Sequence, residues 1–268
     1  MKFLIQIFCI LFISTQVSWA QSPIKNPKGL AYISNQGQWN NKVLFKTGFG
    51  NGALFLDKDG ITFTQMHNDD LEAFHHSKHD GNADVESFNF RGHAWNMKFI
   101  GNTPITITEG VNKLPGYHNY FIGQDKSKWA SHVPLFDQVN YLGLYNGIDL
   151  MVYSNGSNLK YDFIVQPNID PSSIKMLYNG DDGIRLEDGN IKIRTSIGEF
   201  TEFAPYAYQI IDGKEIQVEC HFQLNESVIS FILPAGYDKT KELVIDPELV
   251  GATLSGSTGT NYGHCATF

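Results

Sequence analysis

Histidines and acidic residues gather in one polar stretch of the chain, and their types come nearest to those of a metal site. His75, His76 and His79 lie close together. The flanking imidazoles and carboxylates are His67, Asp69, Asp70 and Asp80. Such groups at short spacing can hold zinc or copper, but a metal site also needs neighbours that fix the rings. The His-Glu-x-x-His pattern of zinc proteases is absent. We therefore expect a solvated histidine-rich segment and predict no metal ligands, while metal binding by the three histidines stays open as the alternative.

Two short motifs imitate ligand-binding loops. Residues 48–52 are glycine-rich like a phosphate-binding loop, but such a loop leads into a helix, and residues 53–56 read as a strand. Residues 57–60, Asp-Lys-Asp-Gly, resemble the opening of a calcium loop, yet Thr62 and Met66 stand near where carboxylates belong. We expect a bend between strands at the first motif and a hairpin turn at the second. The same turn interpretation applies to the Asp/Gly runs at 181–183 and 188–190.

Groups for nucleophilic or acid–base catalysis do not form a recognisable set. No Gly-x-Ser-x-Gly elbow occurs, and Cys220 alternates with Val218 and Phe222 as in a strand, which predicts a buried inert thiol. Glu199 and Glu202 could flank a glycosidic bond, but acids on surface strands are the commoner case. We predict no catalytic, cofactor-binding or metal-binding residue and no enzyme activity.

The tryptophans raise the question of sugar binding. Trp39, Trp95 and Trp129 are accompanied by twelve tyrosines. Exposed rings can stack on sugar faces, but aromatic rings also dominate core burial, which is the interpretation we favour. Location of all three tryptophans in the interior would exclude glycan recognition.

The first twenty residues have the layout of a secretory signal peptide. A basic start at Lys2 precedes an apolar run over 3–13, and small residues end the segment at Ala20. The apolar run is shorter than the ~20 residues of a membrane-spanning helix, and Cys9 lies inside it, so no lipid anchor is indicated. We predict cleavage after Ala20 and a protein that is secreted or held at the cell surface.

Composition limits the remaining classes of function. Acids outnumber bases by 28 to 20, and the formal net charge is −8, so nucleic acid is a poor candidate partner. With 42% hydrophobic residues, the chain is not intrinsically disordered. After cleavage only Cys220 and Cys265 remain, which is no disulfide framework, although one bridge between them stays open.

Strand patterns separated by turn residues dominate the rest of the chain. Four pairs of β-rich runs surround Gly- or Asn-containing loops and predict hairpins, at 53–56 with 61–64, 148–153 with 159–165, 184–186 with 191–194, and 206–211 with 216–222. Further strands are predicted at 42–47, 94–99, 105–108, 173–178, 228–233 and 243–245. We therefore predict an all-β fold, an antiparallel β-sandwich-like domain or domains built from consecutive hairpins.

Three segments depart from this pattern. Residues 67–92 are polar and predict a mobile insertion between two strands, with one short helix near 69–76. Prolines near 166–171 leave a subdivision of the domain open. The tail after Pro247 is rich in Gly, Ser and Thr and lacks a closing element.

Six strings in order resemble one family. They are Tyr-Ile-Ser-Asn-Gln-Gly-Gln-Trp at 32–39, Asn-Tyr-Phe-Ile-Gly at 119–123 with Ser-Lys-Trp at 127–129, Tyr-Asn-Gly-Ile-Asp-Leu at 145–150, Leu-Lys-Tyr-Asp-Phe-Ile-Val at 159–165, Pro-Tyr-Ala-Tyr-Gln at 205–209 and Leu-Val-Ile-Asp-Pro at 243–247. Residues 21–247 thus resemble the N-terminal domain of unknown function that precedes SBBP (seven-bladed β-propeller) repeats in large secreted bacterial proteins. Residues 248–268 are similar to an incomplete first propeller repeat.

The resemblance implies a place for the domain in a longer protein. It implies downstream propeller repeats as partners, display at the cell surface and a role in adhesion, and it carries no established active site. We accordingly expect a non-catalytic structural or interaction module of a chain that continues beyond this sequence. The alternatives are a carbohydrate-binding β-sandwich that uses exposed aromatic residues and, further off, a metal-dependent hydrolase.

Overall fold

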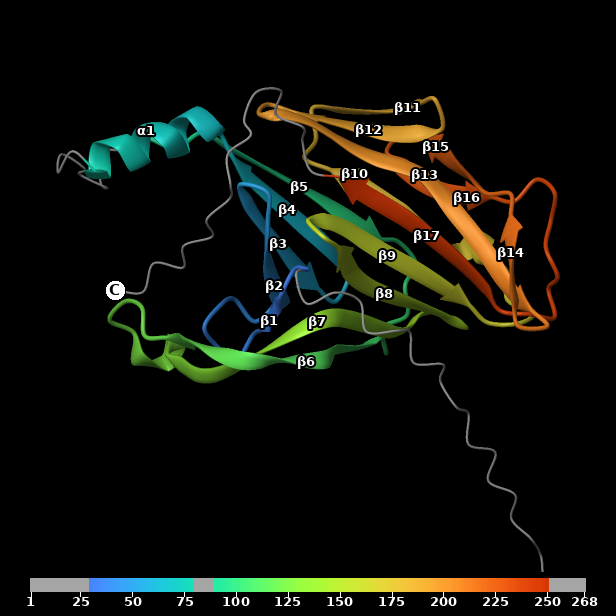
Figure 1. Ribbon diagram of the computed structural model, residues 1–268, viewed down its shortest axis with the longest axis horizontal. Coiled ribbons are helices and arrows are strands. Elements are labelled where there is room, and N and C mark those ends of the chain that lie inside the picture. Colours follow the sequence, from blue (N-terminus) through green and yellow to red (C-terminus); the bar gives the residue numbers. More distant parts are fainter. Residues whose placement is uncertain (1–28, 80–88, 251–268) are drawn as a thin grey trace, which may run out of the picture.

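The computed structural model describes residues 29–79 and 89–250, apart from the side chains of residues 78 and 79. Seventeen of the described segments are strands, and all of them join one antiparallel sheet (Figure 1). The strands are β1 (Tyr32–Ser34), β2 (Val43–Phe49), β3 (Gly52–Asp57), β4 (Gly60–Met66), β5 (Gly92–Phe99), β6 (Ile107–Tyr120), β7 (Ala130–Tyr145), β8 (Ile148–Asn155), β9 (Asn158–Val165), β10 (Met176–Asn179), β11 (Gly183–Glu187), β12 (Asn190–Thr195), β13 (Gly198–Ile211), β14 (Lys214–Val218), β15 (His221–Asn225), β16 (Val228–Ile232) and β17 (Leu243–Val250). The helical segments are α1 (Asn68–His79), η2 (Lys126–Lys128) and η3 (Pro171–Ser173).

The sheet branches at the long strand β7. Along one side β7 pairs with β6, and along the other its first half pairs with β1 and its second half with β8. One branch runs β1–β2–β3–β4–β5–β10–β16–β15 and the other runs β8–β9–β17–β13–β12–β11. Strand β14 pairs with β13 in the second branch and leads directly into β15 at the end of the first. The sheet is therefore nearly closed and barrel-like.

This topology confirms the all-β antiparallel class but not the two-sheet arrangement of a sandwich. The four predicted hairpins are β3–β4, β8–β9, β11–β12 and β13–β14. At two of them the loop residues Asp188-Gly189 and Asp212-Gly213 all have positive φ, between 51° and 79°, as the tight turns that match strand twist require. The fourth hairpin differs in one detail, because its second strand ends at Val218 and Phe222 lies on β15.

Three other expectations need correction. The strand predicted at 173–178 begins with η3, so that β10 spans only Met176–Asn179. The strand predicted at 105–108 is the start of a far longer β6, and β7 was not predicted. The helix predicted near 69–76 is the longer α1, with Asp69 and Asp70 in its first turn where acids favour the helix dipole. Residues 80–88 of the insertion predicted at 67–92 lie outside the described residues.

Aromatic side chains from both branches fill the interior. Trp95 on β5 stacks on Phe63 of β4 at 3.9 Å between ring centroids, and it lies 5.6 Å from the rings of both Tyr178 and Phe200. These rings connect β4, β5 and β10 of one branch with β13 of the other. The prediction that Trp95 fills the core is therefore confirmed. Of the described helices, none is long and apolar enough to cross a membrane.

Candidate functional site

A glutamate occupies the centre of the core. Glu202 lies on the inner face of β13 and has no exposed surface. The hydroxyl of Tyr178 on β10 donates to Oε2 of Glu202 at 2.6 Å, and the hydroxyl of Tyr161 on β9 donates to Oε1. One acid thereby links β9, β10 and β13. Strand β10 belongs to one branch of the sheet, and β9 and β13 belong to the other.

The burial of Glu202 sets its protonation. Removal from water raises the pKa of its carboxyl from 4.5 to about 7, and the two tyrosine hydroxyls act in the opposite direction. Burial and the neighbouring carboxylate in turn raise the pKa of both tyrosines well above 10. A carboxyl with such a pKa is able to exchange a proton near neutral pH. Glu202 is enclosed by the aromatic core, however, and both of its oxygens are already engaged.

The two acids that could have formed a catalytic pair lie on opposite faces of β13. Glu202 points inward, whereas Glu199 lies on the outer face and accepts hydrogen bonds from Arg185 at 2.7 and 3.3 Å. The expectation of a surface acid is thus correct for Glu199 and wrong for Glu202. The reason is the period of two along a strand, which places Glu202 on the same face as the buried Phe200.

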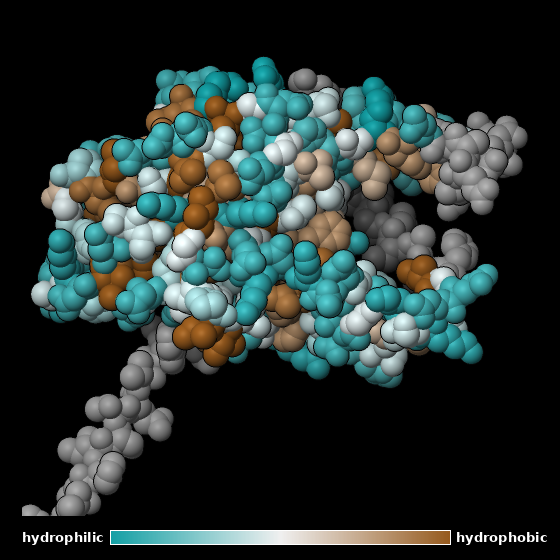
Figure 2. Space-filling view, turned by 180° about the vertical axis from the view of Figure 1, so that it is seen from behind, coloured by the Kyte–Doolittle hydropathy of each residue, from teal (hydrophilic) through white to brown (hydrophobic). Residues whose placement is uncertain are grey.

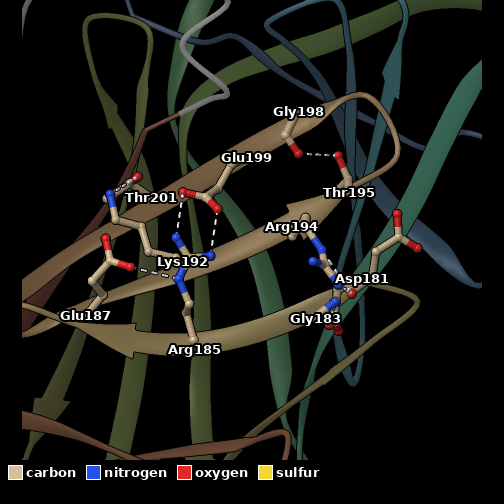
Figure 3. A network of polar contacts seen from close by, with 11 residues as sticks. Asp181, Gly183, Arg185, Glu187, Lys192, Arg194, Thr195, Gly198, Glu199 and Thr201 are labelled. Carbon is tan, nitrogen blue, oxygen red and sulfur yellow. Dashed lines mark hydrogen bonds and ion pairs between the residues drawn. The ribbon is translucent and has the colours of Figure 1, made fainter.

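The outer face of the β11–β12–β13 hairpins carries a charged ladder (Figure 3). Arg185 also binds Glu187 at 2.8 Å, and Lys192 donates to Thr201 at 3.0 Å. These exposed pairs contribute little stability each. Charges along an edge such as β11 discourage pairing with another chain, so the ladder is explained by the fold alone.

An open groove lined by both polar and apolar residues lies at one end of the sheet, and we call it the end groove. One part, with a volume of about 960 Å³, is bordered by the β3–β4 turn and the connection from β5 to β6. The other part, of about 780 Å³, is bordered by the loop that precedes β2 and by η2. Asn41, Leu44 and Thr108 line both parts, so the two adjoin.

Polar side chains of the end groove are held by the turns that carry them. Asp57 accepts the backbone N–H of Asp59 at 2.7 Å, which closes the β3–β4 turn, and Asn102 donates to Asp59 at 3.2 Å. The side-chain amide of Asn35 donates to the backbone carbonyls of Asn40 and Val43 and thereby holds the loop that contains Trp39. Oγ1 of Thr108 is buried without a hydrogen-bond partner among the described atoms. The groove therefore has fixed walls and an unused polar group.

The tip of the β6–β7 hairpin presents an exposed hydrophobic cluster, which we call the hairpin tip and which consists of Phe121, Ile122 and Trp129. Their exposed fractions are 55%, 68% and 38%. Phe121 and Trp129 pack edge to face at 5.7 Å, and the indole N–H of Trp129 donates to Gly123 O at 3.2 Å. The hairpin tip is thus ordered although it is exposed.

The predicted site residues are dispersed through the fold. His75 and His76 are exposed on α1, and the side chain of His79 lies outside the described part. No three His, Cys, Asp or Glu residues within the described ranges converge as metal ligands would. Residues 48–52 form the bend between β2 and β3, and 57–60 form the turn between β3 and β4, as expected.

The cysteine and tryptophan predictions have separate outcomes. Cys220 is a buried thiol whose pKa is raised to about 12 by burial, as its pattern indicated, whereas Cys265 lies outside the described residues. Trp95 lies in the core, Trp39 is half-buried in the wall of the end groove, and Trp129 is exposed. The condition that would have excluded glycan recognition is therefore not met.

Sequence reasoning missed the groups that the structure brings together. Tyr161 and Tyr178 approach Glu202 only through long-range pairing, which leaves no local signal. Glu202 itself could have been noticed, because it alternates with Phe200 in a run whose other face is polar. The lysines of the end groove come from separate elements, namely the loop before β2, the β3–β4 turn, β5 and η2, and they carry no common motif.

Comparison with known proteins identifies a family without assigning a function. No curated protein and no solved structure matches the chain. A family model described as "Domain of unknown function (DUF7948)" matches residues 32–248. That range holds nearly every described strand, and it agrees with the expected resemblance to an uncharacterised domain. The chain therefore belongs to the family Domain of unknown function (DUF7948).

Proposed function

We propose that the domain is a non-catalytic interaction module of an exported protein and that it contributes to adhesion at the cell surface. The observation that carries the proposal is the ordered, exposed hairpin tip. Phe121 and Trp129 are held by ring packing and a backbone hydrogen bond, and all three hydrophobic side chains remain substantially exposed. Exposed aromatic groups of this kind are typical anchors of protein interfaces.

The position of the hairpin tip supports this proposal. The β6–β7 hairpin runs along one side of the molecule, and its tip lies at the end remote from the β11–β14 part (Figure 1). Apolar residues on the face in Figure 2 form small patches separated by hydrophilic ones, so no broad apolar surface competes with the hairpin tip on that face. A small protruding anchor suits contact with an external partner.

The buried acid is consistent with a module that does no chemistry. In our proposal Glu202 serves to join strands, because its oxygens already accept two hydroxyl hydrogen bonds in a closed aromatic interior. Neither part of the end groove is lined by Glu202, Tyr161 or Tyr178. We further propose that SBBP repeats follow this domain in the complete protein and that the signal peptide directs its export.

Glycan recognition is the second candidate function. Two observations favour it, since Trp39 lines the end groove and Trp129 is exposed beside it. In this alternative the aromatic rings would stack on sugar faces while amide and hydroxyl groups bind the sugar hydroxyls.

Retention on cells tests the leading proposal. The fluorescently labelled full chain is incubated with intact cells of the producing bacterium, and the label that remains after washing is measured. Because two exposed anchors are removed, we expect the double variant Phe121→Ser and Ile122→Ser to reduce retention by about tenfold. The matched control, Ile210→Ser with Ile232→Ser, removes two exposed aliphatic side chains elsewhere and should leave retention unchanged. Equal retention of both double variants would refute the proposed role of the hairpin tip.

A further inference from the structure

The end groove is richer in positive charge than the protein as a whole. Lys128 lines the part that contains Trp39, and Lys42, Lys58 and Lys98 line the part that contains the β3–β4 turn. The acids that line the groove are Asp57 and Asp59. The whole chain carries a formal net charge of −8, so the lysines of the groove stand out against an acidic molecule.

Most of these ammonium groups are available. Lys42, Lys98 and Lys128 form no close ion pair with any described residue, although the charge of Lys98 acts on Asp57 and that of Lys128 acts on Asp125. Lys58 donates to the carbonyl of Pro104 at 3.0 Å. The ammonium of Lys46 does not line the groove but lies over the rings of Trp39 and Phe55, 5.6 and 5.2 Å from their centres. Cations gathered in a concave surface attract a ligand of opposite charge and speed its arrival.

The arrangement of the cations indicates the shape of the ligand. Three of the lysines line one part of the groove and Lys128 lines the adjoining part, so together they match charges that are spaced along an extended chain. All of them are lysines, which act as point charges, and the acidic character of the rest of the protein, with its formal net charge of −8, disfavours a polyphosphate such as nucleic acid. Asn41 and Asn102, which also line the groove, offer uncharged hydrogen-bonding groups.

From these features we propose that the end groove binds an acidic polysaccharide whose sugar units carry carboxylates. The lysines pair with successive carboxylates, the amide and hydroxyl groups bind sugar hydroxyls, and the indole of Trp39 packs against a sugar face. This inference deepens the proposed interaction function, because it names the ligand class of a surface next to the hairpin tip. The segment η2 connects the end groove with the hairpin tip, because Ser127 and Lys128 line the groove and Trp129 of the hairpin tip is the next residue.

Calorimetric titration of the full chain tests this proposal, with homogalacturonan oligosaccharides as the acidic probe. Maltooligosaccharides of the same length serve as the neutral probe, and single-stranded DNA serves as a polyanion of another class. We expect binding of the acidic probe that weakens as salt is added, weaker binding of the neutral probe and no comparable binding of DNA. Equal affinity for the acidic and the neutral probe, or tighter binding of DNA, would overturn the proposal.

Charge variants place the binding in the groove. The double variant Lys42→Gln with Lys98→Gln should lose about tenfold in affinity for the acidic probe, since each exposed pair contributes up to about 1 kcal/mol. The control variant Lys214→Gln with Lys241→Gln removes the same charge from exposed lysines outside the groove and should bind as the wild type does. Equal losses in both variants would show an effect of net charge alone and refute the site. Trp39→Ala should weaken binding of both sugar probes, and its melting temperature shows whether it is folded.

The outcome is separable from that of the cell-retention experiment. If the acidic probe fails to bind while the hairpin tip is still required for retention on cells, the groove inference is wrong and the interaction module stands. If the full chain is not retained on cells, the proposed function fails whatever the titration shows.

Discussion

At the scale of single residues, Glu202 shows how a buried acid couples the core to pH. Its folded-state pKa of about 7 lies above the ordinary value of 4.5, so the folded protein binds more protons than the unfolded chain between these values. Stability from this group is therefore complete below about pH 4.5 and is lost as the pH rises towards 7. The sequence shows that Glu202 alternates with Phe200, but its burial depends on strands that pair from distant parts of the chain.

The variant Glu202→Gln should remove this pH dependence. A glutamine keeps the shape and can still bond to both tyrosines without carrying a charge, so we expect it to be more stable than the wild type at pH 8 by about 3 kcal/mol and similar to it at pH 4.5. The measurement is urea unfolding at the two pH values.

As a matched control, Glu199→Gln removes an exposed acid from the other face of the same strand. The pKa of Glu199 is lowered chiefly by its hydrogen bonds with Arg185, so its contribution is lost as the pH falls, in the opposite direction. An unchanged pH profile for Glu202→Gln would show that the buried acid does not govern it.

At the scale of elements, tight turns were predictable because their signals are local. Asp188-Gly189 and Asp212-Gly213 adopt the positive φ values that such sequences favour, and both hairpins followed from them. Strands β6 and β7 were harder to predict, because Pro115, Gly116 and Pro134 interrupt the alternation. Their pairing shifts register twice, and β7 is further supported by a non-local contact with β1 and by the following hairpin with β8. The hairpin tip and one border of the end groove were missed for this reason.

Close approach of two strands gives a prediction at the same scale. A Cβ added at Gly52 on β3 would collide with the carbonyl oxygen of Thr64 on the neighbouring β4. Because the obstacle is backbone, we expect Gly52→Ala to destabilise the protein by about 3 kcal/mol. Gly48→Ala on β2 is the control, since a Cβ there meets nothing within 4 Å, and it should change stability by less than about 1 kcal/mol. Thermal unfolding of both variants checks the difference, and equal effects would contradict the packing at Gly52.

At the scale of the whole molecule, closure of the sheet depends on segments that are remote in sequence. Strand β17, near the end of the described chain, pairs with both β9 and β13, and β10 pairs with β5. Strands from both sides of the segment 166–171 are thus paired with one another. Sequence patterns gave the class of fold and most hairpins, but they could not give these pairings, because the alternation of side chains is the same for any partner strand.

This pairing leads us to expect one cooperative unfolding unit. Urea unfolding followed by tryptophan fluorescence, to which Trp95 in the shared core contributes together with Trp39 and Trp129, should coincide with unfolding followed by far-ultraviolet circular dichroism. Two separated transitions would instead indicate a subdivision near 166–171.

The central claim is that this domain acts through its surface while its buried acid serves the core, and cell retention of Glu202→Gln tests it most directly. We expect folded Glu202→Gln chain to be retained on cells as the wild type is, whereas the hairpin-tip variant Phe121→Ser with Ile122→Ser is largely washed away. Loss of retention in folded Glu202→Gln, with the hairpin-tip variant unaffected, would contradict the claim.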